Sequence, residues 1–174
     1  MKVNPQYSDN ERLSDLKCAL EKKDKLEAQS TLDEILRGRQ SDSAFVSPGN
    51  IDKHMRIYVA GPYTPYGVSF HDAARVANEN TVRAINVGVD VALKGHFPFI
   101  PHLSHYMHLH GKATLSYEYY IGADMTWLDV SDAILFYNHT IGASSGADKE
   151  LEVSIGSGKK IFFFIEEIPS YSKK

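Results

Sequence analysis

Several features that are typical of common protein classes are scarce or absent in this sequence. Each absence excludes a kind of site or a class of protein. The 174 residues contain one cysteine, Cys18, so an intrachain disulfide and a zinc site built from cysteines are both impossible. No apolar run approaches the length that crosses a bilayer, and residues 1–13 lack the apolar middle of a signal peptide. The net charge of −3 offers no basic surface to nucleic acid or to an anionic membrane. We therefore expect a cytoplasmic protein that binds neither nucleic acid nor membranes.

The two best-known phosphate-binding signatures are absent as well. The chain contains neither a GxxxxGK loop nor a GxGxxG fingerprint. It does contain a glycine turn, Gly61-Pro62-Tyr63-Thr64, directly after an apolar run. Glycine lets the backbone approach a ligand closely, and the N–H groups that follow can hold an anion. Taken alone, this turn is better explained by the topology of the chain.

What the sequence does contain is an alternation of short apolar runs with helical patterns. We predict strands at 56–60, 97–100, 133–137 and 161–165, helices at 72–94, 117–128 and 147–155, and an irregular loop at 103–115. Strands that alternate with helices form a doubly wound, mainly parallel α/β sheet sandwiched by helices, of the Rossmann or flavodoxin-like type. The inner face of the first of these helices is predicted to carry Ala74, Ala77, Val82, Ile85, Val89 and Leu93.

Residues 1–54 have a different pattern from the rest of the chain. They are dense in charge, with leucines at helical spacing, and a break near 23–25 predicts a helical hairpin. Ser8 or Asp9 is expected to cap the first helix and Gly38 to end the second, followed by a linker. The narrow apolar stripe predicts that this arm packs on the main domain or on a second subunit. We therefore divide the chain into a helical arm with linker, 1–54, and an α/β domain, 55–174.

The candidate chemistry lies at the carboxyl ends of the predicted strands. Ligands of open α/β sheets bind there, and Ser144, Gly146 and Glu150 follow the third strand. Glu150 falls in the first turn of the predicted helix, where the positive helix end favours a carboxylate anion suited to act as a nucleophile. Asp124 adds a second carboxylate, and two carboxylates are what glycosyl transfer with retention requires. Asp132, at the entrance of a strand, is better explained as a turn or capping residue.

Histidines and aromatic residues crowd the segment between 102 and 127. A metal site is the weaker interpretation of the histidines, because Pro101 precedes them and neither a carboxylate nor a cysteine lies beside them. We retain His102, at the carboxyl end of a strand, as a ligand contact. The aromatic residues are predicted to pack in the core and between helices rather than to stack on a base; they are Tyr117, Tyr119, Tyr120 and Trp127.

Five segments follow one another in a recognisable order and spacing. They are IYVAGPYT (57–64), FPFIPH (97–102), GADMTWLDVSDAILF (122–136), SSGADKEL (144–151) and GKKIFF (158–163). Together they resemble the nucleoside 2-deoxyribosyltransferase-like superfamily, which includes the nucleoside deoxyribosyltransferases and the deoxynucleoside-monophosphate N-glycosidases. The resemblance extends over residues 55–165, and it depends on the ordered set, since none of the segments is specific alone.

The resemblance implies a role for several residues. Glu150 matches the nucleophile that attacks C1′ and forms a covalent glycosyl–enzyme intermediate, and Asp124 matches the residue that contacts the base and protonates it. Gly61, in the turn with Pro62 and Tyr63, would border the sugar and any 5′-phosphate. Ser144 and Gly146 match the S-x-G of the hydrolase branch, where the serine holds the sugar or phosphate. This favours a nucleotide N-hydrolase over a base-exchanging transferase.

The resemblance also implies that no metal or organic cofactor is needed and that the chain forms a homodimer or a higher homo-oligomer. The arginine-bearing phosphate turn of some hydrolases is missing from GPYTPYG (61–67), which leaves phosphate recognition open. Three other interpretations stay open too. The chain could be a non-catalytic nucleotide-sensing module, an NAD-type glycohydrolase, or an ordinary α/β domain in which Glu150 caps a helix.

Overall fold

The computed structural model describes residues 9–41, 51–63, 69–138 and 140–172. Its elements, in chain order, are α1 (Asp9–Glu21), α2 (Lys25–Ser41), β1 (Arg56–Ala60), α3 (Phe70–Leu93), β2 (Phe97–Phe99), η1 (Pro101–Leu103), α4 (Ser104–His110), α5 (Tyr117–Val130), β3 (Ala133–Phe136), α6 (Ser145–Gly156), β4 (Lys160–Phe162) and η2 (Ile165–Glu167). None of the described helices is both long enough and apolar enough to span a membrane.

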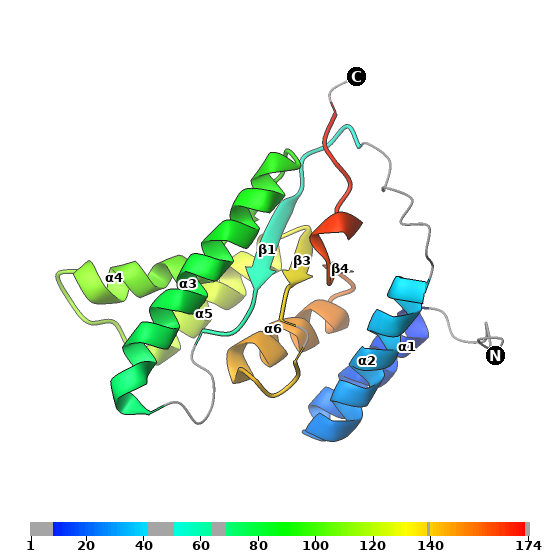
Figure 1. The fold of residues 1–174 in the computed structure, drawn as a ribbon, viewed down its shortest axis with the longest axis horizontal. Helices are drawn as coiled ribbons and strands as arrows, with labels where there is room; N and C mark the ends of the chain where they lie inside the picture. Colours follow the sequence, from blue (N-terminus) through cyan, green and yellow to red (C-terminus); the bar gives the residue numbers. More distant parts are fainter. Residues whose placement is uncertain (1–8, 42–50, 64–68, 139, 173–174) are drawn as a thin grey trace.

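The four strands form one parallel sheet in the order β2-β1-β3-β4. Alternate side chains of β1 and β3 serve two separate hydrophobic clusters, as the period of a strand requires. Ile57 and Val59 pack with α3 on one face, whereas Tyr58 and Ala60 pack with α5 and α6 on the other. Helices therefore cover both faces of the sheet, which confirms the predicted doubly wound α/β fold (Figure 1).

The N-terminal helices α1 and α2 form the predicted hairpin, with the break at residues 22–24 and Lys23 at φ +58°. Leu16, Leu32 and Ile35 are fully buried in the same cluster as Tyr58 and Phe163. The hairpin packs against α6, so the arm lies on the α/β layer (Figure 1). The prediction that Gly38 ends the second helix is wrong, because α2 continues to Ser41. A Cβ at Gly38 would lie 2.7 Å from Nη1 of Arg12, the far end of a flexible side chain on the facing helix.

The buried face of helix α3 differs from the predicted one. Val82, Val89 and Leu93 are 44%, 50% and 80% exposed. The buried face consists mostly of smaller residues, and its members are Ala77, Asn80, Thr81, Ala84, Gly88 and Val91. A Cβ at Gly88 would overlap the Ile100 side chain, so a row of small residues brings this helix close to the sheet. The larger apolar side chains are left on the outside, and hydrophobicity alone indicated the wrong stripe.

Other element boundaries differ in detail from the prediction. Residues 101–110 form η1 and α4 rather than a loop, since the turn after Pro101 continues into helical hydrogen bonding. The second and fourth strands end earlier than predicted, at Phe99 and Phe162. Ile165, predicted as the end of a strand, begins the short helix η2.

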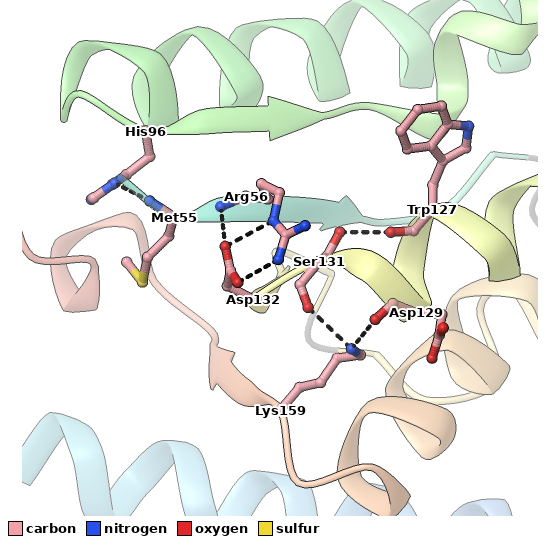
Figure 2. A network of polar contacts seen from close by, with 8 residues as sticks. All are labelled: Met55, Arg56, His96, Trp127, Asp129, Ser131, Asp132 and Lys159. Atoms are coloured by element: carbon pink, nitrogen blue, oxygen red, sulfur yellow. Dashed lines mark hydrogen bonds and ion pairs between the residues drawn. The ribbon is translucent and has the colours of Figure 1, made fainter. Parts of the chain in front are cut away.

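Asp132 holds the amino-terminal edge of the sheet, away from the strands' carboxyl ends (Figure 2). It accepts hydrogen bonds from the backbone N–H of Arg56 at 2.8 Å and from the Arg56 guanidinium at 2.7 Å and 3.1 Å. These bonds lower the pKa of Asp132. In the same region, Lys159 Nζ donates to the carbonyls of Asp129 and Ser131 at the end of α5. Asp132 therefore joins β1 to the start of β3.

Candidate functional site

A cavity of about 430 Å³ lies at the carboxyl ends of the strands, between the turn after β1, the η1–α4 segment, α5 and the N-terminus of α6. Seven of the residues predicted for the site line it: Gly61, Tyr63, His102, Asp124, Ser144, Gly146 and Glu150. Pro62 does not line the cavity, and its carbonyl accepts a hydrogen bond from His102 Nε2 at 3.0 Å. Sheet topology thus brings together residues from four segments.

Glu150 lines this cavity and is 6% exposed. The hydroxyl of Tyr58, from the middle of β1, donates a 2.7 Å hydrogen bond to Glu150 Oε1. Sequence analysis missed Tyr58, which we had assigned only to an apolar strand. One signal was available, because a buried tyrosine hydroxyl needs a polar partner and Tyr58 is the polar residue among four buried ones.

The prediction that Glu150 is favoured as an anion by the helix end is wrong. Helix α6 begins at Ser145, so Glu150 lies in its second turn, beyond the reach of most of the helix-end effect. The pKa of Glu150 is instead raised to about 8, chiefly by burial and further by the charge of Asp124, although the hydrogen bond from Tyr58 lowers it. Removal from water thus decides the charge of this group.

Asp124 projects from α5 into the same cavity and is partly buried. Burial raises its pKa to about 6. Two carboxyl groups with raised pKa values therefore face one cavity, and the charge of one opposes ionisation of the other. At neutral pH, such a pair keeps one proton between its two members, which equips it to supply a carboxylate and a carboxylic acid in one place.

Gly61 is required by the packing of Tyr137. A Cβ at Gly61 would overlap the Tyr137 ring, which covers the turn after β1. We predict that Gly61→Ala lowers the free energy of unfolding by about 1–3 kcal/mol through overpacking, measured by urea denaturation. Adding Tyr137→Ala should make the Gly61→Ala change nearly neutral, because the clashing ring is gone.

Gly122 provides the matched control for this prediction. It lies in α5 with nothing within 4 Å of an added Cβ, so Gly122→Ala should keep or slightly increase stability. Equal losses in Gly61→Ala and Gly122→Ala would contradict a steric role for Gly61.

The N-terminus of α6 forms one side of the cavity. Ser144 is the N-cap residue and is 8% exposed, and its side chain makes no capping hydrogen bond. The Asp148 carboxylate accepts the N–H of Gly142 at 2.8 Å, which holds the preceding loop. A Cβ at Gly146 would meet only Ser144 Oγ, at 3.9 Å. Space for a side chain exists at Gly146, so its glycine is not explained by packing.

The histidine-rich segment lies on η1 and α4. His102 and His105 are 5% and 4% exposed, and both line the cavity. Burial lowers the pKa of each, so both imidazoles are neutral at neutral pH. Within the described part of the chain, no three histidine, cysteine, aspartate or glutamate side chains are arranged to hold a metal ion.

The aromatic residues of α5 are not the core residues that we predicted. Tyr117, Tyr119 and Trp127 are 65%, 54% and 52% exposed. Trp127 stacks on Phe99 with a ring-centroid distance of 5.0 Å, which is packing at the surface. Tyr117 and Tyr120 line the cavity. The pattern indicated a buried helix because α5 is rich in apolar residues, yet only Leu128 of α5 is fully buried.

Searches against models of protein families, curated proteins and solved structures found no match to this chain.

Proposed function

We propose that this protein cleaves the N-glycosidic bond of a nucleoside or deoxynucleoside, or of its 5′-monophosphate, with Glu150 as nucleophile and Asp124 as proton donor. One observation carries the proposal. A buried glutamate, held by a tyrosine hydroxyl, shares a cavity with a second carboxyl group, and both have raised pKa values. Retaining glycosyl transfer needs this combination of carboxylate and carboxylic acid.

The proposed reaction has two steps. In the first, a Glu150 oxygen bonds to C1′ while the C1′–N bond breaks, and the bonding electrons leave with the base. Asp124 transfers its proton to the departing base. In the second step, water attacks C1′ of the glycosyl ester, gives its proton to Asp124 and releases Glu150 as a carboxylate. A second base in place of water would give transfer instead of hydrolysis.

Tyr58 assists the first step by keeping one oxygen of Glu150 oriented. Burial raises the pKa of the Tyr58 phenol far above neutrality, so it stays protonated and donates. Because Tyr58 occupies Oε1, we assign the attack to Oε2. The transition state carries positive charge on the sugar, and the Glu150 carboxylate stabilises it before the bond forms.

The proton shared by the two carboxyl groups predicts a bell-shaped pH profile. The reactive form holds one proton, so kcat/KM should fall below about pH 6, where the pair is doubly protonated, and above about pH 8, where both groups are ionised. Initial rates from pH 5 to 9 measure this. Asp124→Asn should leave a profile with a single ionisation; a wild-type profile that stays flat from pH 5 to 9 would contradict the requirement for one proton on the pair.

The pKa of Glu150 is higher than that of Asp124. This order favours a second mechanism, in which the two residues exchange roles on the same substrates. With the higher pKa, Glu150 is the better acid, and Asp124 could then activate water without a covalent intermediate. Quenching the reaction with acid and measuring the intact protein by mass spectrometry distinguishes the two mechanisms. A mass increase of one glycosyl group that is absent from Glu150→Gln supports the nucleophile, whereas hydrolysis without any adduct supports the reversed roles.

The test of the proposed function is a substrate panel. The full chain is incubated with ribo- and deoxynucleosides and their 5′-monophosphates, with and without an acceptor base, and free base is measured by chromatography. Base release supports the proposal, and a new nucleoside in the presence of acceptor indicates transfer. Nucleotide binding by calorimetry without base release would favour a sensing module, and nicotinamide release from NAD would favour an NAD-type glycohydrolase.

A further inference from the structure

Three residues that line the cavity, from η1, α4 and α5, carry buried polar atoms without a hydrogen-bond partner. The described residues include six such side-chain atoms, and three of them are His102 Nδ1, His105 Nε2 and Tyr120 Oη. All three residues line the cavity. A buried polar atom left unpaired costs about 1–3 kcal/mol, so a concentration of them at one place indicates that a bound molecule pairs with them.

The hydrogen of His102 is assigned by its neighbour. His102 Nε2 lies 3.0 Å from the carbonyl oxygen of Pro62, which can only accept a hydrogen bond. The ring therefore carries its hydrogen on Nε2. Burial lowers the pKa of His102, which leaves the imidazole neutral. His102 Nδ1 is thus a hydrogen-bond acceptor.

His105 offers a hydrogen-bond donor, whereas His102 offers an acceptor. Its Nδ1 lies 2.7 Å from the hydroxyl of Tyr63, and burial raises the pKa of Tyr63 and lowers that of His105. If the phenol donates to Nδ1, the imidazole hydrogen lies on Nε2. The reverse arrangement would leave both the Tyr63 hydrogen and Nε2 without a partner among the described residues. Asn80 Nδ2 donates to the Tyr63 carbonyl at 3.0 Å, which holds this tyrosine in place. His105 Nε2–H is therefore the donor.

We infer that His105 and His102 form a donor–acceptor pair that binds the polar edge of the departing base, and that they select bases with an acceptor and an N–H donor side by side. This inference rests on the proposed function, because it takes the base to lie against η1 and α4 while Glu150 meets the sugar. Asp124, on α5, lines the same cavity. Bases of this class include the 6-oxopurines and the 4-oxopyrimidines.

The pair would select its base because binding weakens when a buried donor or acceptor is left without a hydrogen-bond partner. A base without the carbonyl oxygen and the adjacent N–H leaves both imidazole nitrogens unpaired, and a site built for hydrogen bonding discriminates strongly against such an analogue. We expect binding to weaken by at least about fivefold, corresponding to the lower end of the cost of one unpaired buried group.

The test measures binding in the full chain carrying Glu150→Gln, so that no substrate is consumed. Calorimetry compares the deoxynucleosides of hypoxanthine and uracil with those of purine and 2-pyrimidinone, which lack the oxygen and the adjacent N–H. The ratio of the two affinities within a pair is the readout. His105→Phe should bring the ratio toward 1, and His105→Gln, which keeps an N–H donor, should retain part of it. His110→Phe is the control, since His110 lies on α4 outside the cavity lining and is exposed.

The outcomes separate this inference from the proposed function. A ratio of five or more that His105→Phe removes and His110→Phe keeps supports the inference, whether or not the wild-type chain releases base. Equal affinity for the oxo bases and their analogues, or a ratio unchanged in His105→Phe, overturns it even if the wild-type chain is an active hydrolase. Absence of binding by all four nucleosides overturns it as well. If His105→Phe does not fold, as judged by thermal unfolding, His105→Gln decides: a ratio lower than in the chain with His105 intact supports the inference, and an unchanged ratio overturns it.

Discussion

Glu150→Gln is expected to reduce base release by about 10³-fold or more while nucleoside binding persists. The amide has the same shape as the carboxyl group and can still accept the hydrogen bond from Tyr58, so the cavity keeps its form. What is lost is the anion that bonds to C1′. Chromatography of released base and calorimetry of nucleoside binding measure the two effects separately.

Glu152→Gln is the control for this experiment. Glu152 lies on the same helix, and its carboxylate pairs with Lys149 at 3.2 Å on the surface. Removing it takes one negative charge from α6 without touching the cavity, so base release should stay close to that of the wild-type chain. Wild-type turnover by Glu150→Gln would rule out this residue as nucleophile or acid, and equal losses in the two variants would point to a general effect of charge on the helix.

The same Glu150→Gln substitution is expected to stabilise the fold at alkaline pH. The pKa of Glu150 rises from 4.5 to about 8 on folding, so the folded state binds a proton that the unfolded state has released between these values. The contribution of Glu150 to wild-type stability is therefore fully present below about pH 4.5 and is lost as the pH rises through about 8. Glutamine carries no ionisable group, so the variant escapes this loss.

The expected gain at pH 9 relative to pH 5 is on the order of 3–5 kcal/mol, which corresponds to roughly 10 °C in melting temperature for a chain of this size. Thermal unfolding across pH 5 to 9 measures the difference between Glu150→Gln and the wild-type chain, with Glu152→Gln as control. A difference that does not change with pH would mean that Glu150 is ionised in the fold as readily as in water. Loss of activity together with gain of stability is the behaviour expected of a strained functional group.

Most of the fold could be predicted because strands and helices leave local patterns. The apolar runs at 56–60 and 133–137 indicated buried parallel strands, and the structure has strands at Arg56–Ala60 and Ala133–Phe136. Which face of a helix is buried could not be predicted from the local pattern. On α3, hydrophobicity indicated Val82 and Val89, but the helix packs through alanine and glycine because these residues allow it to approach the sheet closely.

The sequence alone determined which residue types stand at the carboxyl ends of the strands, since a parallel α/β order places the segments after each strand at one edge. Tertiary structure decided what those residues are chemically. Tyr58 and Glu150 are separated by 92 residues, and only folding makes one the partner of the other. Burial, which depends on every segment packed around a group, raises the pKa of Glu150 and of Asp124. The hydrogen-bond partners of His102 and His105 also come from other segments of the chain. The local sequence does not show how deeply a group is buried. The protonation states of the site residues therefore could not be predicted from the sequence.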